Sequence, residues 1–295
     1  MKAWWIFTKE RFEPVSHLLM IFVFILVHYL LARKLQVIHC ENYSLVFLFY
    51  AITFFYFKLR LYDEVKDYEI DLIVNKTRPL PRGLLNHRDM YNGMAVCIAF
   101  EIIFFSIQHS RAIVSILIAI FYSLLMYKEF FIREKIRPHL TIYAMSHTIV
   151  TSLLTFAIFS FLTKESFRIV ITNKNFLFFS ISNWMLFNIF EFGRKTFEIT
   201  EERENVDTYS SLFGKKGAAL LVLSQVIISI FLLHQLPVFD VSIIHWGLGF
   251  LLFLQIIITL QFVISNKAKN AKRYRMMSSV YIILFYIILA LGLYF

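Results

Sequence analysis

The chain has 295 residues, of which 59% are hydrophobic and 17% are charged, and its formal net charge is +10. A soluble domain of this length could not bury so much apolar surface in one core, so the composition excludes a soluble globular protein and indicates a polytopic membrane protein. The excess of basic residues is the kind that membrane proteins keep at one membrane surface, and no basic, aromatic-rich stretch outside the apolar runs indicates binding of nucleic acid.

Apolar runs recur nine times along the chain, each about the 17 to 25 residues that a helix needs to cross a bilayer. No linker rich in Pro, Gly or Ser interrupts them, so we expect a single domain, residues 1–295, that is all helical. The nine runs cover residues 16–32, 43–61, 90–107, 111–127, 138–162, 176–193, 216–235, 242–264 and 277–295.

The distribution of Lys and Arg predicts the orientation of these helices. With the N-terminus in the cytoplasm, 24 of the 30 basic residues fall in cytoplasmic segments, which satisfies the positive-inside rule. We therefore expect an integral protein of a bacterial cytoplasmic (inner) membrane. The acidic segments that follow the second and sixth helices would then both face the cytoplasm.

The first acidic segment, "YDEVKDYEID" at residues 62–71, directly follows the second apolar run. Asp63, Asp67 and Asp71 have the spacing that stacks side chains along one face of a continuing helix. Like charges repel there, and a divalent cation would relieve the repulsion; oxygen ligands without His or Cys favour Mg²⁺. The alternative is a solvated helix end whose counter-charges are Lys66 and Arg60.

The segment "NKTRPLPRG", residues 75–83, follows the first acidic segment. Pro79 and Pro81 end the helix and stiffen the chain, while Arg78 and Arg82 place cations beside the carboxylates. Acids that bind metal, together with nearby cations, suit a diphosphate.

The second acidic segment, residues 188–218, follows the sixth apolar run and contains Glu191, Arg194, Glu198 and Glu202. Their spacing of three, four and four would place them on one face of an extended sixth helix. Charges near the bilayer boundary favour a functional site. The alternative is a set of ordinary helix ion pairs, each worth about 0.2 to 0.5 kcal/mol.

Together these segments carry a family resemblance. "DEVKDYEIDLIVNKTRPLPRG" resembles the first motif of the UbiA superfamily of intramembrane prenyltransferases, N-D-x-x-D-x-x-x-D followed by R-P-L-P-x-G. Asp67 and Asp71 match its second and third acids. "ERENVDTYSSLFG" resembles the segment after the family's second motif, and Glu198 and Glu202 fall on the D-x-x-x-D of that motif. Nine helices with both motifs cytoplasmic is also the architecture of this family.

Some positions depart from the family pattern. Asp63 and Glu64 stand where the family has Asn-Asp, Glu replaces Asp at both acids of the second motif, and Lys195 stands where Asp is common. Glu still ligates a metal, but its extra methylene changes the distance from the backbone. Lys128, at the end of the fourth helix, resembles a family lysine that contacts diphosphate; the alternative is a lysine that extends to the membrane surface.

The resemblance implies a UbiA-like bundle with a central cavity open to lipid, and Mg²⁺-dependent transfer of an isoprenyl group from an isoprenyl diphosphate to a lipophilic or interfacial acceptor. It implies metal binding by Asp63, Glu64, Asp67, Asp71, Glu198 and Glu202. It implies diphosphate binding by Arg78, Lys128, Arg194 and Lys195. It implies catalytic roles for Asp67, Asp71, Glu198, Glu202 and Lys128.

Other functions stay open at this point. Within the family, cyclisation of a terpene and phosphoribosyl transfer are possible, and the substituted acids allow a membrane protein that binds isoprenoids without catalysis. A CDP-alcohol phosphotransferase would need a D-G-x-x-A-R pattern, which this sequence lacks. A cation permease would need acids at mid-membrane on several helices, whereas only Glu101 lies well inside an apolar run. The sequence does not decide the oligomeric state.

Overall fold

The computed structural model describes residues 2–39, 44–108, 110–203, 206–237 and 241–295, and within these ranges it is helical without strands. Nine of its helices are long and apolar enough to cross a membrane, which confirms the predicted number. They are α2 (Pro14–Lys34), α3 (Ser44–Lys66), α5 (His87–Gln108), α6 (Ser110–Tyr127), the pair α8 (Leu140–Thr148) and α9 (Val150–Thr163), α11 (Lys174–Arg194), α12 (Tyr209–His234), α13 (Ser242–Ile264) and α14 (Ala268–Tyr294).

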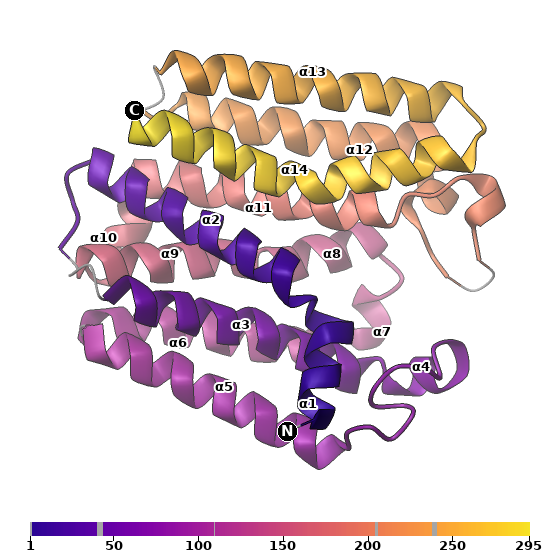
Figure 1. Ribbon diagram of the computed structural model, residues 1–295, viewed down its shortest axis with the longest axis horizontal. Coiled ribbons are helices and arrows are strands. Elements are labelled where there is room, and N and C mark those ends of the chain that lie inside the picture. Colours follow the sequence, from indigo (N-terminus) through magenta and orange to yellow (C-terminus); the bar gives the residue numbers. More distant parts are fainter. Residues whose placement is uncertain (1, 40–43, 109, 204–205, 238–240) are drawn as a thin grey trace.

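Short elements connect these spans. They are α1 (Lys2–Phe7), the π-helix η1 (Thr8–Phe12), α4 (Tyr68–Val74), the 3₁₀-helix η2 (Glu129–Phe131), α7 (Arg133–Ile136), α10 (Phe167–Thr172) and the 3₁₀-helix η3 (Ile199–Glu201). All except α10 lie at the end of the bundle where α3 ends, and α10 lies at the opposite end (Figure 1). One end of the molecule therefore carries most of the structure outside the spans.

The long helices run side by side as a bundle, with α12, α13 and α14 along one flank and α3, α5 and α6 along the other (Figure 1). The helix α11 lies between the flanks and packs against α8, α9, α12 and α14, while α3 packs closely against α5. Because water is absent from the hydrocarbon core, only fully hydrogen-bonded helices can cross it. The apolar runs therefore fold as helices that lie side by side.

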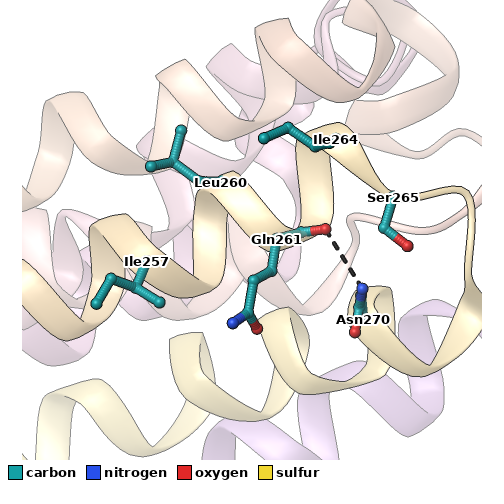
Figure 2. Close-up of a pocket in the computed structure, with 6 residues that line it drawn as sticks. All are labelled: Ile257, Leu260, Gln261, Ile264, Ser265 and Asn270. Carbon is teal, nitrogen blue, oxygen red and sulfur yellow. Dashed lines mark hydrogen bonds between the residues drawn. The ribbon is translucent and has the colours of Figure 1, made fainter.

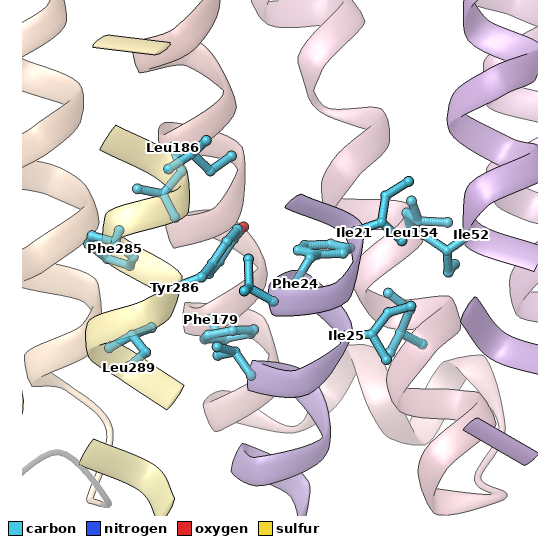
Figure 3. Close-up of a cluster of buried hydrophobic side chains, with 14 of the residues drawn as sticks. Ile21, Phe24, Ile25, Ile52, Leu154, Phe179, Leu186, Phe285, Tyr286 and Leu289 are labelled. Atoms are coloured by element: carbon cyan, nitrogen blue, oxygen red, sulfur yellow. The ribbon is translucent and has the colours of Figure 1, made fainter. Parts of the chain in front are cut away.

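The centre of the bundle is filled by side chains from helices far apart in the sequence (Figure 3). Phe24 on α2, Leu154 on α9, Phe179 on α11 and Tyr286 on α14 are all fully buried, and the rings of Phe24 and Tyr286 lie 5.6 Å apart. Lipid tails are as apolar as these residues, so close packing rather than escape from water stabilises the association. Whether a central cavity opens to lipid stays a prediction.

A polar network joins four helices inside this core. Asn183 on α11 donates to Thr155 on α9 at 3.0 Å, and Tyr286 donates to the Asn183 side-chain oxygen at 3.0 Å. His28 on α2 lies 3.2 Å from the Thr155 hydroxyl through Nε2. Buried polar groups must be paired in this environment, so the network favours one arrangement of the four helices over its alternatives.

A charged pair also lies within the spans. Lys58 on α3 contacts Glu101 on α5 at 2.6 Å, and both side chains are fully buried. An isolated charge at this depth would be costly, whereas each of these charges has its partner across the helix interface. The pair therefore joins α3 to α5 and accounts for the acid that the sequence places inside an apolar run.

Gly193 lets α11 pack tightly against α14, since a Cβ atom at this position would lie 2.1 Å from the Ser278 Cβ atom. We expect Gly193→Ala to destabilise the protein by about 1 to 3 kcal/mol, because overpacking at a rigid helix contact forces the backbones apart. The measurement is the thermal unfolding midpoint in detergent. Gly249→Ala on α13 is the matched control, since a Cβ there meets nothing within 4 Å. Equal midpoints for the two variants would contradict this packing.

Candidate functional site

The two acidic segments lie at the same end of the bundle, as the sequence predicts (Figure 1). The first continues from α3 into α4, and the second follows α11. The loop from α6 to α8, which contains η2 and α7, reaches the same end. Charged side chains from these three connections meet the apolar interior here.

The first acidic segment keeps its helical hydrogen bonds across a break at Asp67. Asp67 N donates to Asp63 O at 3.0 Å, and Asp71 N donates to Asp67 O at 2.9 Å. Asp67 has non-helical backbone angles and separates α3 from α4. The three aspartates therefore follow one another as the spacing predicts, but each carboxylate has a different partner.

Asp63 and Asp67 interact with charged residues of the other two connections, Arg194 at the end of α11 and Arg137 between α6 and α8. Asp63 is paired with Lys66 at 3.2 Å and with Arg60 at 3.4 Å, and Asp67 lies 3.9 Å from the Arg137 guanidinium. Burial raises the pKa of Asp67, and the positive charge of Lys66 opposes this effect. A further cation beside Asp67 would favour its ionised form.

Glu64 and Asp71 are held by other parts of the chain. The Arg11 side chain, on η1, pairs with Glu64, which is fully buried. Arg78 pairs with Asp71, and Asn75 donates to the same carboxylate at 2.8 Å. These contacts join the N-terminal segment and residues 75–83 to the first acidic segment. Arg78 and both carboxylates therefore already have partners within the protein.

The connection between α6 and α8 supplies residues that the sequence analysis missed. Glu129, buried at the start of η2, pairs with Arg137 at 2.7 Å and with Arg133 at 3.2 Å, and accepts a hydrogen bond from the Tyr143 hydroxyl at 3.1 Å. These contacts place the Arg137 guanidinium beside Asp67. In the sequence, the adjacent Arg137 and Pro138 at the end of this connection were the feature that could have indicated these residues.

The backbone of η2 is strained. Glu129, Phe130 and Phe131 have φ angles of 49°, 55° and 56°, a left-handed conformation that costs about 1 to 3 kcal/mol per non-glycine residue and concentrates at functional sites. The turn directs Glu129 inward and packs Phe130 against the ring of His147, at 5.8 Å between centroids. Through these contacts, the strained turn positions both Arg137 and α8 at this end of the bundle.

The role of Lys128 in diphosphate binding stays a prediction. Its side chain is exposed, and its ammonium lies 4.8 Å from the centroid of the neighbouring Tyr127 ring. Lys66 is instead the lysine among the acids: its side chain is 11% exposed, it pairs with Asp63, and it lies over the Tyr143 ring at 5.6 Å. The helix α6 ends one residue before Lys128, and η2 then reverses the chain. Lys128 therefore points away from Asp63 and Lys66.

The prediction of one continuous helical face in the second acidic segment is wrong. The helix α11 ends at Arg194, and both Glu198 and Glu202 have extended backbone angles. The reason is that Tyr209 N donates to Lys195 O at 3.0 Å, which closes the following loop on itself. The residues Glu204 and Asn205 of this segment lie outside the described residues.

Among the described residues of the second segment, the interactions with the first segment come from its helical part. Glu191 pairs with Arg194 at 2.6 Å and with Lys195 at 3.2 Å. The Arg194 guanidinium also interacts electrostatically with the Asp63 carboxylate. The charge of Arg194 therefore acts on the first segment, although its direct ion pair is with Glu191.

Glu198 and Glu202 face α12 instead. Glu198 pairs with Lys215 at 2.7 Å, and Glu202 accepts hydrogen bonds from Thr208 at 2.7 Å and from Ser210 at 2.7 Å. Glu202 lines a hollow of about 670 Å³ together with Lys215 and neighbouring residues of the loop and α12. In this arrangement the two glutamates shape the loop, and their metal-binding role stays a prediction.

The same loop is fastened to α14. Arg275 donates two hydrogen bonds to the Glu201 carboxylate, at 2.9 and 2.7 Å, and the hydrogen bond from Arg275 lowers the pKa of Glu201. The guanidinium also lies 4.4 Å from the Phe197 ring centroid. A bidentate pair stacked on an aromatic ring holds the loop more rigidly than a single ion pair would.

A second hollow lies on the outside of α13, lined by Ile257, Leu260 and Ile264 with Gln261 and Asn270 at its edge (Figure 2). Asn270 donates to the Gln261 carbonyl at 3.4 Å. Its lining is mostly apolar and it contains no acid or base. It is therefore not the site at which the charged segments meet.

The carboxylates can be tested against the Mg²⁺ that the sequence predicts. Across the described ranges, no three His, Cys, Asp or Glu side chains converge as a ready metal cluster. Mg²⁺ commonly binds through one or two carboxylates together with substrate phosphates. Asp63 and Asp67, one helical turn apart and electrostatically coupled, provide such a pair, so the first segment fits an ion held jointly with a diphosphate.

Comparison with known proteins agrees with this architecture. The UbiA prenyltransferase family matches residues 18–281. The chain belongs to the UbiA prenyltransferase family. No curated protein sequence matches this UbiA family member.

Two solved structures share the fold of this UbiA family member. A digeranylgeranylglyceryl phosphate synthase superimposes with a TM-score of 0.60 at 16% identity, covering 99% of each chain. A UbiA homolog from Aeropyrum pernix K1 superimposes with a TM-score of 0.64 at 14% identity, covering 94% of this chain and 96% of that one. The predicted family and the predicted all-helical, nine-span fold are confirmed.

Proposed function

We propose that this UbiA family member transfers an isoprenyl group from an isoprenyl diphosphate to a lipophilic or interfacial acceptor within the membrane. The observation that carries this proposal is a charged layer above an apolar bundle, where the spans end. Lys66 pairs with Asp63, Arg137 lies 3.9 Å from Asp67, and the charge of Arg194 acts on Asp63. A molecule with a diphosphate head and a long apolar tail fits this division. Family membership supports the same reaction class.

The three cations bind the diphosphate and stabilise the charge that develops on it as the bond to the isoprenyl carbon breaks. Preorganised charges of this kind act most strongly where water is excluded. When bound, Mg²⁺ would add positive charge at the leaving oxygens, held by Asp63 and Asp67. The carboxylates balance the cations in the absence of substrate, so the layer is not left with uncompensated positive charge.

The apolar residues below this layer take the isoprenyl chain. They also keep water from the allylic carbocation, which would otherwise be quenched to an alcohol. The acceptor must therefore reach the charged layer from the bilayer or its surface. We place the layer on the cytoplasmic side, since the excess of Lys and Arg lies there.

The test is an assay of the purified protein with radiolabelled isoprenyl diphosphates of increasing chain length, Mg²⁺ and a native lipid extract. We expect release of diphosphate that depends on Mg²⁺, together with a labelled lipid product whose identity reveals the acceptor. The variant Asp67→Asn is the control for a contaminating phosphatase. Tight binding of these diphosphates without release at any chain length would contradict catalysis and favour a protein that only binds isoprenoids.

A further inference from the structure

His147 lies on α8, one helical turn from Tyr143, at the lower edge of the charged layer. Its imidazole interacts electrostatically with Lys66 and Asp63 of α3 and with Glu191 of α11. The next residue, Thr148, begins a polar chain that continues through Asn188 and Gln225 into the bundle. His147 therefore stands between the residues that would hold a diphosphate and the interior that would hold its tail.

The hydrogen bonding of His147 defines which ring nitrogen carries the proton. Nδ1 lies 2.6 Å from the backbone oxygen of Tyr143, and a carbonyl oxygen only accepts, so Nδ1 is the donor. In the neutral ring, Nε2 then carries a lone pair. Nε2 is buried and has no hydrogen-bond partner among the described residues. The structure thus presents a buried nitrogen base whose protein partner is missing.

The ring is also fixed in orientation. Its centroid lies 4.1 Å from that of Tyr143, with the two ring planes tilted by 30°, and Phe130 of the strained η2 turn meets it edge-on. Tyr143 is itself held by Glu129 through its hydroxyl. The same contacts that place Arg137 beside Asp67 therefore hold the imidazole, which connects His147 to the site rather than to the core alone.

Resting on the proposed function, we propose that His147 is the base that accepts the proton of a hydroxyl-bearing acceptor. The bond between the isoprenyl carbon and diphosphate breaks, and the electron pair leaves with the diphosphate. The acceptor oxygen forms a new bond to that carbon and transfers its proton to Nε2 of His147. The products are a prenyl ether, diphosphate and a protonated imidazole, which returns its proton to water. The acceptor class is therefore an alcohol or phenol.

His17 is the other described imidazole with a buried, unpartnered ring nitrogen. It stacks on Phe12 of the N-terminal segment at 4.5 Å and interacts electrostatically with Arg60 and Glu13. No contact joins it to Tyr143 or to the η2 turn in the described ranges. His17 lies on α2 and packs against the N-terminal segment, so the assignment falls on His147.

The experiment separates loss of proton transfer from loss of substrate binding. Each variant receives the labelled isoprenyl diphosphate that the wild-type protein uses best, with native lipid extract, and both diphosphate release and the labelled lipid product are measured. His147→Gln keeps a polar side chain of similar size, and His147→Ala leaves space for added imidazole. His139→Gln is the matched control, because His139 is exposed at the start of the same helix.

We expect His147→Gln to lower formation of the lipid product about 10²- to 10⁴-fold, the usual contribution of a positioned base. Diphosphate release should fall only a few-fold, because cleavage of the bond to diphosphate does not need the base and the longer-lived cation is lost to water that reaches the site slowly. Imidazole should restore product in His147→Ala, and His139→Gln should behave as wild type.

Equal losses of diphosphate release and lipid product, or unchanged lipid product, in variants with a wild-type unfolding midpoint would overturn the assignment. If His147→Gln does not fold, the outcome with His147→Ala and imidazole decides. A wild-type protein that releases no diphosphate would contradict the proposed function and, with it, this assignment.

Discussion

Lys66→Met is expected to lower kcat/KM for the isoprenyl diphosphate about 10²- to 10³-fold, the range observed when one preorganised charge at a developing anion is removed. Lys66 is nearly buried, it pairs with Asp63, and it lies over the Tyr143 ring. Methionine keeps the length and the packing of the side chain while it removes the charge. Steady-state kinetics with saturating Mg²⁺ measure the effect.

Lys128→Met is the matched control for this prediction. The resemblance assigns diphosphate binding to Lys128, whereas its exposed side chain contacts Tyr127. We expect this variant to keep kcat/KM within a factor of about three, since an exposed charge is screened by water and salt. The opposite order, with a large loss for Lys128→Met and a small one for Lys66→Met, would show that the lysine of the site is the one the sequence indicates.

Asp67→Asn is expected to lower turnover about 10²- to 10³-fold and to raise the Mg²⁺ concentration needed for half-maximal activity. Asp67 has a weaker protein partner than Asp63, and its side chain faces the connection that carries Arg137. Asparagine keeps the shape but loses the anionic oxygen. Because burial raises the pKa of Asp67, wild-type activity should also decline as the pH falls through that raised value.

Glu202→Gln provides the comparison for Asp67→Asn. The glutamate accepts hydrogen bonds from Thr208 and Ser210, and a glutamine can accept them through its side-chain oxygen. We expect a loss of less than about ten-fold and an unchanged Mg²⁺ requirement, since a neutral acceptor preserves hydrogen bonds of modest net worth. A collapse as large as that of Asp67→Asn would show that Glu202 is a metal ligand, and that substrate rearranges the loop after α11.

The spans were predictable because each is a local property of the sequence. The apolar runs near 90–107 and 242–264 correspond to α5 and α13 with small shifts at their ends, since insertion into lipid depends on hydropathy summed along one helix. The side of the bundle on which the acidic segments lie followed from the number of spans between them. The family followed from residues within two short segments.

The partners of the charged residues were not predictable, because each is decided by distant parts of the chain. The helical spacing of Glu191, Glu198 and Glu202 continues past Arg194, but the hydrogen bond from Tyr209 to Lys195 ends the helix there. Residue spacing alone does not reveal such a long-range hydrogen bond.

The direction of side chains at a chain reversal cannot be read from the sequence either. The left-handed turn at Glu129 turns Lys128 outward and brings Arg137 inward.

The pairing of acids with protein cations has a physical consequence for binding. Under the proposed function, we expect a diphosphate that enters the layer to replace carboxylates as the partner of Lys66, Arg137 and Arg194, which would make those carboxylates available to a metal ion. We therefore expect substrate and metal to assist each other's binding, a linkage that is reciprocal by thermodynamic necessity.

A structure with Mg²⁺ and an unreactive thio-analogue of an isoprenyl diphosphate would reveal where the diphosphate binds. We predict that the diphosphate contacts Lys66, Arg137 and Arg194, that a metal ion joins it to Asp63 or Asp67, and that the isoprenyl chain enters the bundle past His147. A diphosphate bound in the hollow beside Lys215 and Glu202, with Lys66 and Asp63 still paired to each other, would show that the charged layer is not the diphosphate site.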